Sequence, residues 1–236
     1  MSEVIRPSTV LPAERTTFTV RTSDGVDLIG EVARPLGPSV ATMLTLHPNP
    51  EGGGMMDSHV FKKAANRLPA MAGITVVRFN TRGTESPQGK SGGTYDAGGA
   101  EGLDVAAILN YCTNELNLEN IWAVGWSFGT DLALRHARDS HIKGLILLSP
   151  PLRWTNQEDL QYWAHDGRPV IALVPEHDDY LKPKEAAERF ALIKQCKVLP
   201  MEDAKHLWVG EPAVYRVLTE IVRVLAPDRL PLPEEM

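Results

Sequence analysis

The stretch Gly125-Trp126-Ser127-Phe128-Gly129 indicates how this chain folds. It matches Gly-x-Ser-x-Gly, a strained turn that carries a serine between a strand and a helix, above the edge of a parallel sheet. The four apolar residues 121–124 predict the strand, and residues 131–135 predict the start of the helix. Glycines are needed there because neighbouring backbone must approach closely. The pattern therefore predicts that Ser127 is an exposed nucleophile.

Outward from this turn, short apolar runs alternate with longer runs of helical period. This order is typical of an α/β fold with a mostly parallel sheet and helices on both faces. The predicted strands, about eight, span 16–21, 26–33, 40–46, 74–79, 121–124, 145–148, 170–174 and 197–199. The other predicted helices span 58–71, 100–112, 182–193 and 212–225. Ser23-Asp24-Gly25 predicts that the first two strands form an antiparallel hairpin.

Length and composition favour one domain with a sizeable core. The chain has 236 residues, of which 43% are hydrophobic. We expect an N-terminal arm over 1–15, one α/β domain over 16–226, and an extended proline-rich tail over 227–236. The segment between the strands at 145–148 and 170–174 is too short for a separate cap domain, so the site should be open.

Charge and cysteine content exclude several classes of partner. The net charge is -6, with 30 acidic and 24 basic residues interspersed, which disfavours nucleic acid. No stretch approaches the run of about 18 apolar residues that spans a bilayer, and the start lacks the apolar core of a secretory signal, so we expect a cytoplasmic protein without membrane insertion. Two distant cysteines and scattered histidines indicate neither a disulfide framework nor a metal site. We expect no cofactor.

A second stretch, Gly89-Lys90-Ser91-Gly92-Gly93, also satisfies Gly-x-Ser-x-Gly. No apolar strand directly precedes it, and it lies in a glycine-rich segment over 83–99, so we expect Ser91 to be a loop residue. The same stretch resembles the end of a phosphate-binding loop, but Thr84 stands where the first glycine of that motif belongs. Nucleotide hydrolysis is therefore disfavoured.

A serine hydroxyl needs a histidine to accept its proton, and in this architecture the order along the chain is serine, acid, histidine. His206 is the only histidine that follows the expected acid, and it lies in a loop between a strand and the last helix. It is the predicted base. The other histidines after Ser127 precede the acid or lie within its loop: His136, His141, His165 and His177.

The acid should follow the strand 170–174, because the carboxyl ends of parallel strands gather the site. Such a carboxylate would hold the imidazole tautomer and stabilise the imidazolium. Pro175-Glu176-His177-Asp178-Asp179 offers three carboxylates. We favour Asp178, then Asp179, then Glu176, since charge alone does not separate them.

Two backbone amides should stabilise the oxyanion of a tetrahedral intermediate. The residue after the nucleophile, Phe128, supplies one. The other is expected in His47-Pro48-Asn49-Pro50, where Asn49 is the only amide donor after His47 because proline has no N–H. His47 itself is expected to pack beneath this loop.

Together these residues resemble the α/β-hydrolase superfamily, specifically its small bacterial members without a large lid, over about residues 26–224. The likeness rests on 46–50 with 52–54, on 78–83, on 99–101 with Asp104, on the 125–129 turn and on His206. The resemblance implies that Asn80, Arg82, Glu101 and Asp104 brace loops rather than touch substrate. Pro48 and Pro175 depart from the glycines that are frequent at these positions in the family.

We expect hydrolysis of a small-molecule ester or thioester through an acyl-enzyme on Ser127. Trp126, Trp154 and Trp208 could line an apolar acyl site or belong to the core. Fold and triad are shared by other activities, so a peptidase or amidase, an acyltransferase, and a non-catalytic ligand-binding protein stay open as alternatives.

Overall fold

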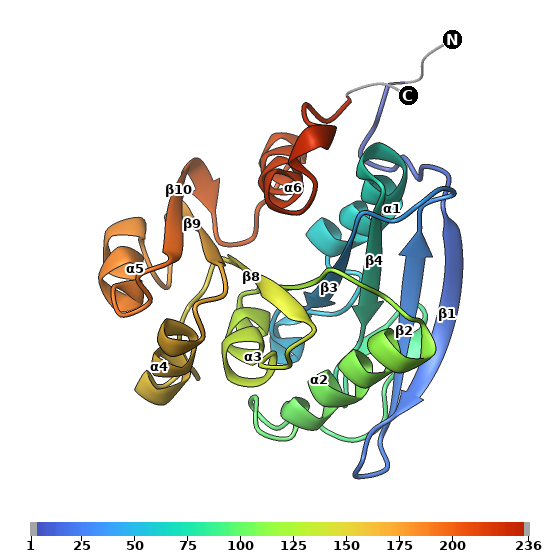
Figure 1. The fold of residues 1–236 in the computed structure, drawn as a ribbon, viewed down its shortest axis with the longest axis horizontal. Coiled ribbons are helices and arrows are strands. Elements are labelled where there is room, and N and C mark those ends of the chain that lie inside the picture. The colour runs from blue at the N-terminus through green and yellow to red at the C-terminus, as the bar shows by residue number, and fades with distance from the viewer. Residues whose placement is uncertain (1–3, 234–236) are drawn as a thin grey trace.

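An eight-stranded sheet forms the centre of the computed structural model, which describes residues 4–233 (Figure 1). The strands lie in the order β1-β2-β4-β3-β7-β8-β9-β10. β2 pairs antiparallel with β1 and β4, and all other neighbours are parallel. The bounds are β1 Glu14–Arg21, β2 Asp27–Arg34, β3 Ala41–Leu46, β4 Ile74–Phe79, β7 Ile121–Trp126, β8 Ile142–Leu148, β9 Val170–His177 and β10 Cys196–Lys205.

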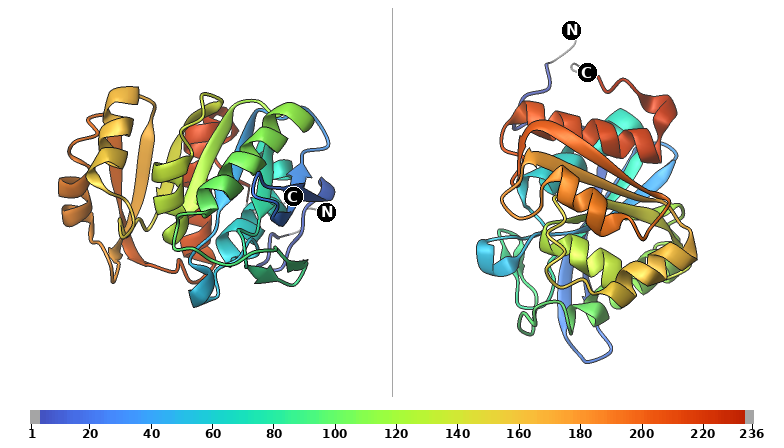
Figure 2. Two further views of the ribbon diagram at one scale, coloured as in Figure 1. Left: turned by 90° about the horizontal axis from the view of Figure 1, so that it is seen from below. Right: turned by 90° about the vertical axis from the view of Figure 1, so that its left-hand side faces the viewer.

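Helices cover both faces of this sheet, as Figures 1 and 2 show. α1 and α6 pack on one face, and α2, α3, α4 and α5 contribute to the core on the other. Their bounds are α1 His59–Ala72, α2 Glu101–Asn110, α3 Phe128–His136, α4 Gln157–Asp166, α5 Pro183–Phe190 and α6 Glu211–Leu225. A π-helical turn, Tyr111–Glu115, extends α2.

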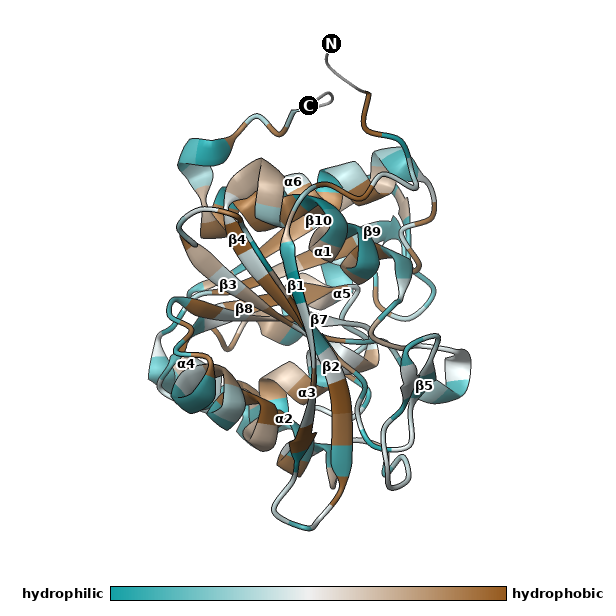
Figure 3. Cartoon of the chain, turned by 90° about the vertical axis from the view of Figure 1, so that its right-hand side faces the viewer, coloured by the Kyte–Doolittle hydropathy of each residue, from teal (hydrophilic) through white to brown (hydrophobic). Residues whose placement is uncertain are grey.

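The central strands are buried on both faces. Every residue of β3 and β4 is buried, and successive side chains enter opposite core clusters: Met43 lies on the α1 side and Leu44 on the α3 side. Figure 3 shows the resulting hydrophobic colouring of these strands between the helical layers. Parallel strands with both faces covered read as continuous apolar runs, which is why the sequence revealed them clearly.

The order of the strands reverses at β3. The chain proceeds from β3 to β4 on one side and returns to place β7 on the other. The helix after β3 covers one face and the helix after β7 covers the opposite face. The loops that leave the carboxyl ends of these two strands therefore separate, which is where open α/β sheets form their sites.

The predicted α/β architecture is confirmed, including the opening hairpin, but β5, β6, β10 and α4 differ from the prediction. β10 is longer than expected and ends at Lys205, because Pro200, Met201 and Lys205 still pair with β9 on either side of a register shift. Residues Glu85–Ser86 and Gly89–Lys90 form a small additional hairpin, β5 and β6. α4 was not expected, although Asn156 and Asp159 form a reciprocal cap at its start.

Both ends of the described chain pack onto the domain. The Leu11 amide donates to Asn66 O of α1 at 2.9 Å. At the other end, residues 227–229 form a 3-10 turn, and Leu232 is buried with its carbonyl accepting from Tyr215 Oη at 2.7 Å. The expected extended tail is thus partly folded, while residues 1–3 and 234–236 lie outside the described residues. Within 4–233, none of the helices combines the length and apolarity needed to cross a bilayer.

Candidate active site

The segment 125–129, here called the elbow, turns sharply between β7 and α3. Ser127 has φ 52° and ψ -120°, a strained conformation for a residue with a side chain. A Cβ on Gly129 would lie 1.9 Å from Leu46 O, and one on Gly125 would lie 2.3 Å from Gly129 O. Both glycines are therefore required by close packing, and Ser127 is left partly exposed at the carboxyl end of β7.

His206 joins the serine to a carboxylate. Its Nε2 lies 2.8 Å from Ser127 Oγ, and its Nδ1 lies 2.8 Å from Asp178 Oδ2. The other oxygen of Asp178 accepts from the amides of Tyr180 at 2.8 Å and Leu181 at 3.3 Å. The imidazole and the carboxylate are both buried. Three side chains that are distant in sequence thus form one continuous chain of hydrogen bonds.

The neighbouring carboxylates are oriented elsewhere. Asp179 is exposed, and Glu176 accepts from the Asp203 amide at 3.0 Å. Only Asp178 of the three candidates has a hydrogen bond to His206 among the described residues. The turn closed by the Asp178 amide on Pro175 O, at 3.2 Å, places this residue inward.

The loop that carries His206 is tied to the ends of two strands. The His206 carbonyl accepts from Trp126 Nε1 and from Ser149 Oγ, each at 3.1 Å. These bonds connect the loop to β7 and to the residue that follows β8. They hold the backbone of His206 in place and leave its ring free to contact Ser127.

The two amides expected at an oxyanion hole begin short helical segments. Phe128 is the first residue of α3, and Asn49 caps the 3-10 turn Pro50–Gly52. In residues 4–233, neither amide donates a hydrogen bond to another protein group. The Asn49 loop lies against the elbow, because Gly129 packs on the carbonyls of Leu46 and His47. Unpaired amides at a helix start attract negative charge.

His47 is a buried structural residue. Its Nδ1 donates to Pro48 O at 2.7 Å, and its Nε2 accepts from the Thr81 amide at 3.0 Å. Burial lowers the pKa of His47 to about 4, so the ring is neutral near pH 7. The carbonyl and N–H of a trans peptide point in opposite directions, so the bond to Pro48 O turns the Asn49 amide away from His47.

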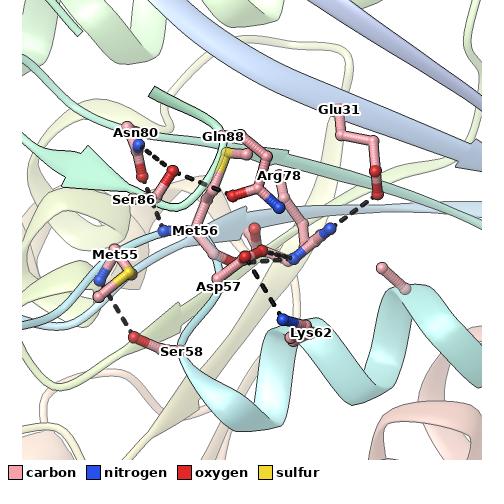
Figure 4. Close-up of polar contacts among 12 residues, drawn as sticks. Glu31, Met55, Met56, Asp57, Ser58, Lys62, Arg78, Asn80, Ser86 and Gln88 are labelled. Atoms are coloured by element: carbon pink, nitrogen blue, oxygen red, sulfur yellow. Dashed lines mark hydrogen bonds and ion pairs between the residues drawn. The ribbon is translucent and has the colours of Figure 1, made fainter. Parts of the chain in front are cut away.

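A polar network braces the segment that leads from this loop into α1 (Figure 4). Arg78 of β4 donates to Met56 O at 3.2 Å and to Asp57 Oδ1 at 2.5 Å. It also donates to Glu31 of β2 at 2.7 Å. The Met56 amide donates to Asn80 Oδ1 at 2.9 Å. The segment is thereby anchored directly to the end of β4 and, through Arg78, to β2.

A second network braces the glycine-rich loop and α2. Arg82 donates through Nε and Nη2 to Asp104, at 3.0 and 2.8 Å, and through Nη1 to Asp24 at 2.9 Å. The hydrogen bond from Arg82, with a further one from Thr22, lowers the pKa of Asp24 to about 2. Glu101 accepts from two loop amides, at 2.7 and 2.9 Å. These contacts agree with the bracing role that we expected for Asn80, Arg82, Glu101 and Asp104.

Ser91 is a structural residue with no free hydroxyl. It is fully buried, its Oγ donates to Asn80 O at 2.7 Å, and it accepts from the Ile29 amide at 3.0 Å. The two cysteines are free, and burial raises the pKa of Cys112 and of Cys196 to about 12, which disfavours the reactive thiolate. Glu176, His177 and Asp203 bring possible metal-binding atoms within 4.8 Å of one another, but all three are exposed.

The three expected substrate-lining tryptophans occupy different environments. Trp126 and Trp208 are 2% and 0% exposed and belong to the core on the α1 and α6 side, so they present no surface to a substrate. Only Trp154 is half-buried, with its ring 5.2 Å from that of Phe128. The assignment of Trp126 and Trp208 to the substrate site is thus not supported.

Two aromatic residues near the site were not expected from the sequence. Tyr95 packs against Phe128 at 5.4 Å between ring centroids, and Tyr180 packs against His206 at 4.6 Å. The position of Tyr180 two residues after Asp178 was a usable signal, since both belong to one short loop. Tyr95 lies in the glycine-rich stretch, where periodicity gave no indication of its contacts.

Comparison with known proteins agrees with this geometry. The profile of the α/β-hydrolase fold family matches residues 42–168. The chain belongs to the α/β-hydrolase fold family. No curated protein sequence gave a match.

Solved structures extend the likeness over most of the chain. A serine hydrolase homologue from Coxiella burnetii is 26% identical, with a TM-score of 0.73, over 89% of this chain and 97% of its own. A serine hydrolase without a lid from Xanthomonas campestris is 25% identical, with a TM-score of 0.72, over 96% and 100%. A Pyrococcus furiosus esterase shares the fold at 21% identity, with a TM-score of 0.69, over 93% and 99%. This family member therefore resembles serine hydrolases, one of which lacks a lid.

Proposed function

We propose that this α/β-hydrolase cleaves a carboxylic ester or thioester through an acyl-enzyme intermediate on Ser127. The observation that supports the proposal is the continuous hydrogen-bonded chain from Ser127 through His206 to Asp178, with both contacts at 2.8 Å. The exposed part of Ser127 leaves room for a carbonyl carbon to approach. A cytoplasmic location and a small-molecule substrate belong to the same proposal.

The reaction has two steps. Ser127 Oγ attacks the carbonyl carbon while its proton passes to His206 Nε2, and the carbonyl oxygen becomes an oxyanion. His206 then gives this proton to the leaving alcohol or thiol as the bond to the acyl carbon breaks. Water then gives a proton to the same nitrogen as its oxygen attacks the acyl carbon. His206 returns this proton to Ser127 Oγ as the bond to the acyl group breaks and the acid is released.

The surrounding groups have separate roles in this scheme. Asp178 accepts from His206 Nδ1, which keeps Nε2 available for the serine proton and stabilises the imidazolium. The amides of Phe128 and Asn49 would stabilise the oxyanion, and the start of α3 adds its partial positive charge. Trp154 and Tyr95, both packed on Phe128, would border the acyl group.

Hydrolysis of p-nitrophenyl acetate, butyrate and octanoate tests the proposal. The wild type should hydrolyse at least one ester, and Ser127→Ala should lower kcat by about 10⁴-fold or more, because the acyl-enzyme no longer forms. Ser140→Ala is a suitable control, since Ser140 is exposed at the amino end of β8, the edge of the sheet opposite Ser127. A Ser127→Ala protein as active as the control would reject the proposal, and an inactive wild type would favour a ligand-binding protein.

A further inference from the structure

The two loops that carry Asp178 and His206 expose large apolar side chains. Tyr180 is 62% exposed in the loop after β9, and Leu207 and Val209 are 56% and 75% exposed between β10 and α6. Single exposed apolar residues need no explanation, but these three belong to the loops that form the site. Their neighbours in sequence, Asp178 and His206, are buried.

Tyr180 is fixed in position by the acid and contacts the base. Its amide donates to Asp178 Oδ1 at 2.8 Å, and its ring centroid lies 4.6 Å from that of His206 with an interplanar angle of 54°. The ring therefore covers part of the imidazole, while most of its own surface faces solvent. This surface is positioned before any substrate binds.

The chemistry of the proposed reaction identifies what contacts this surface. His206 Nε2 must deliver its proton to the oxygen or sulfur of the leaving group, so that group must lie beside the imidazole. In the proposed reaction, the acyl oxygen would lie instead toward the Phe128 amide. A substituent on the leaving alcohol thus extends across the side of the site that Tyr180 borders.

The charge around this surface favours an uncharged alcohol. Asp179 and Lys182 lie near Tyr180 in sequence, and Lys205 precedes His206, while Glu176 and Asp203 add carboxylates near the ends of β9 and β10; all five residues are exposed. Because both signs are present, neither a cationic nor an anionic alcohol would meet a field of one sign. The remaining attraction is the apolar surface of Tyr180 and Leu207.

We infer that Tyr180, with Leu207 next to the base in sequence, forms the leaving-group subsite and selects esters of apolar, uncharged alcohols. This inference rests on the proposed function and names the substrate class of the same site. Each methylene that the subsite covers should raise kcat/KM, because the alcohol chain is removed from water in the transition state. Tyr180 is therefore a specificity-determining residue.

Three esters separate the alcohol side from the acyl side. Ethyl acetate and hexyl acetate differ only in the length of the alcohol chain, and the two alcohols are similar leaving groups. Ethyl hexanoate has the longer chain on the acyl side instead. In the wild type, kcat/KM for hexyl acetate should exceed that for ethyl acetate by about tenfold. Tyr180→Ala should lower this ratio by about fivefold and leave the ratio of ethyl hexanoate to ethyl acetate within about twofold.

Two further variants sharpen the test. Tyr180→Phe should keep the alcohol-chain ratio, because it retains the ring. Leu36→Ser should also keep it, since Leu36 is 77% exposed before β3 at the opposite edge of the sheet. Leu36→Ser controls for a general loss of exposed apolar surface, and Tyr180→Phe controls for the loss of the hydroxyl group.

Several results would overturn the inference. An unchanged alcohol-chain ratio in Tyr180→Ala would do so, as would an equal fall of both ratios, which would indicate that Tyr180 acts only by supporting His206. If Tyr180→Ala has a lower mass by sedimentation than the wild type while the alcohol-chain ratio is unchanged, the surface would instead be a contact between copies of this chain. Hydrolysis without any alcohol preference rejects this inference alone, whereas a wild type inactive on all esters removes the proposed function as well.

Discussion

Asp178 uses both of its carboxylate oxygens, one for His206 and one for the amides of Tyr180 and Leu181. An asparagine at this position could present its NH₂ to His206 and stabilise the wrong tautomer. We expect Asp178→Asn to lower kcat for p-nitrophenyl butyrate by about 10⁴-fold. Asp179→Asn should stay within about twofold of the wild type, because Asp179 is exposed and lies outside this chain of hydrogen bonds.

The adjacent aspartates make a matched pair, since both variants remove one charge from the same loop. Circular dichroism and thermal unfolding would show whether each variant folds. An active Asp178→Asn, or a loss confined to Asp179→Asn, would contradict the proposed role of Asp178.

At the residue level, the sequence indicated which types of residue form the site better than it indicated where each side chain points. The strand before the motif and the helix after it favoured Ser127, and order along the chain favoured His206. Asp178 and Asp179 have the same charge, and the local turn distinguishes them: the Asp178 amide donates to Pro175 O, and its carboxylate accepts from the amides of Tyr180 and Leu181. The burial of Trp126 and Trp208 depends on packing against α1 and α6, which local sequence does not encode.

His47 links the loop after β3 to the residues after β4, and burial keeps it neutral. Its folded pKa of about 4 lies below the ordinary 6.5, so the unfolded chain binds a proton first as pH falls. Stability from neutral His47 is therefore complete above pH 6.5 and declines as pH falls toward 4. Between pH 7 and 4.5 this residue alone should lower the free energy of unfolding by about 2 kcal/mol.

Urea unfolding at pH 7 and pH 4.5 would measure this contribution. His47→Gln retains an acceptor for the Thr81 amide but has no titrating ring, so its loss between the two pH values should be smaller by about 2 kcal/mol. NMR of the histidine rings should show one ring that stays neutral to about pH 4. A ring at His47 that titrates near 6.5, together with equal losses in both proteins, would contradict this account.

Secondary-structure elements were predictable where one physical signal dominated. The buried strands β3, β4 and β7 read as apolar runs because both faces are covered. The polar end of β10 and the short hairpin of β5 and β6 carry no apolar period, so their pairing was not visible. Asn156 followed three residues later by Asp159 is a helix-start pattern, and it indicates the beginning of α4.

Across the molecule, the site lies where the sheet reverses its order. Ser127 and Asn49 follow the neighbouring strands β7 and β3, while Asp178 and His206 follow the paired strands β9 and β10. Parallel pairing brings all four carboxyl ends to one edge. The alternation of strands and helices predicts that these site residues meet at one edge of the sheet. Which of them come within hydrogen-bond distance depends on the complete fold.

The central claim is that Ser127 is the nucleophile that His206 activates. A fluorophosphonate forms a covalent adduct with an activated serine, and peptide mapping by mass spectrometry locates it. We expect one adduct in the wild type, on the peptide that contains Ser127, and none in Ser127→Ala. An adduct on Ser91, or no adduct in a folded wild type, would contradict the account.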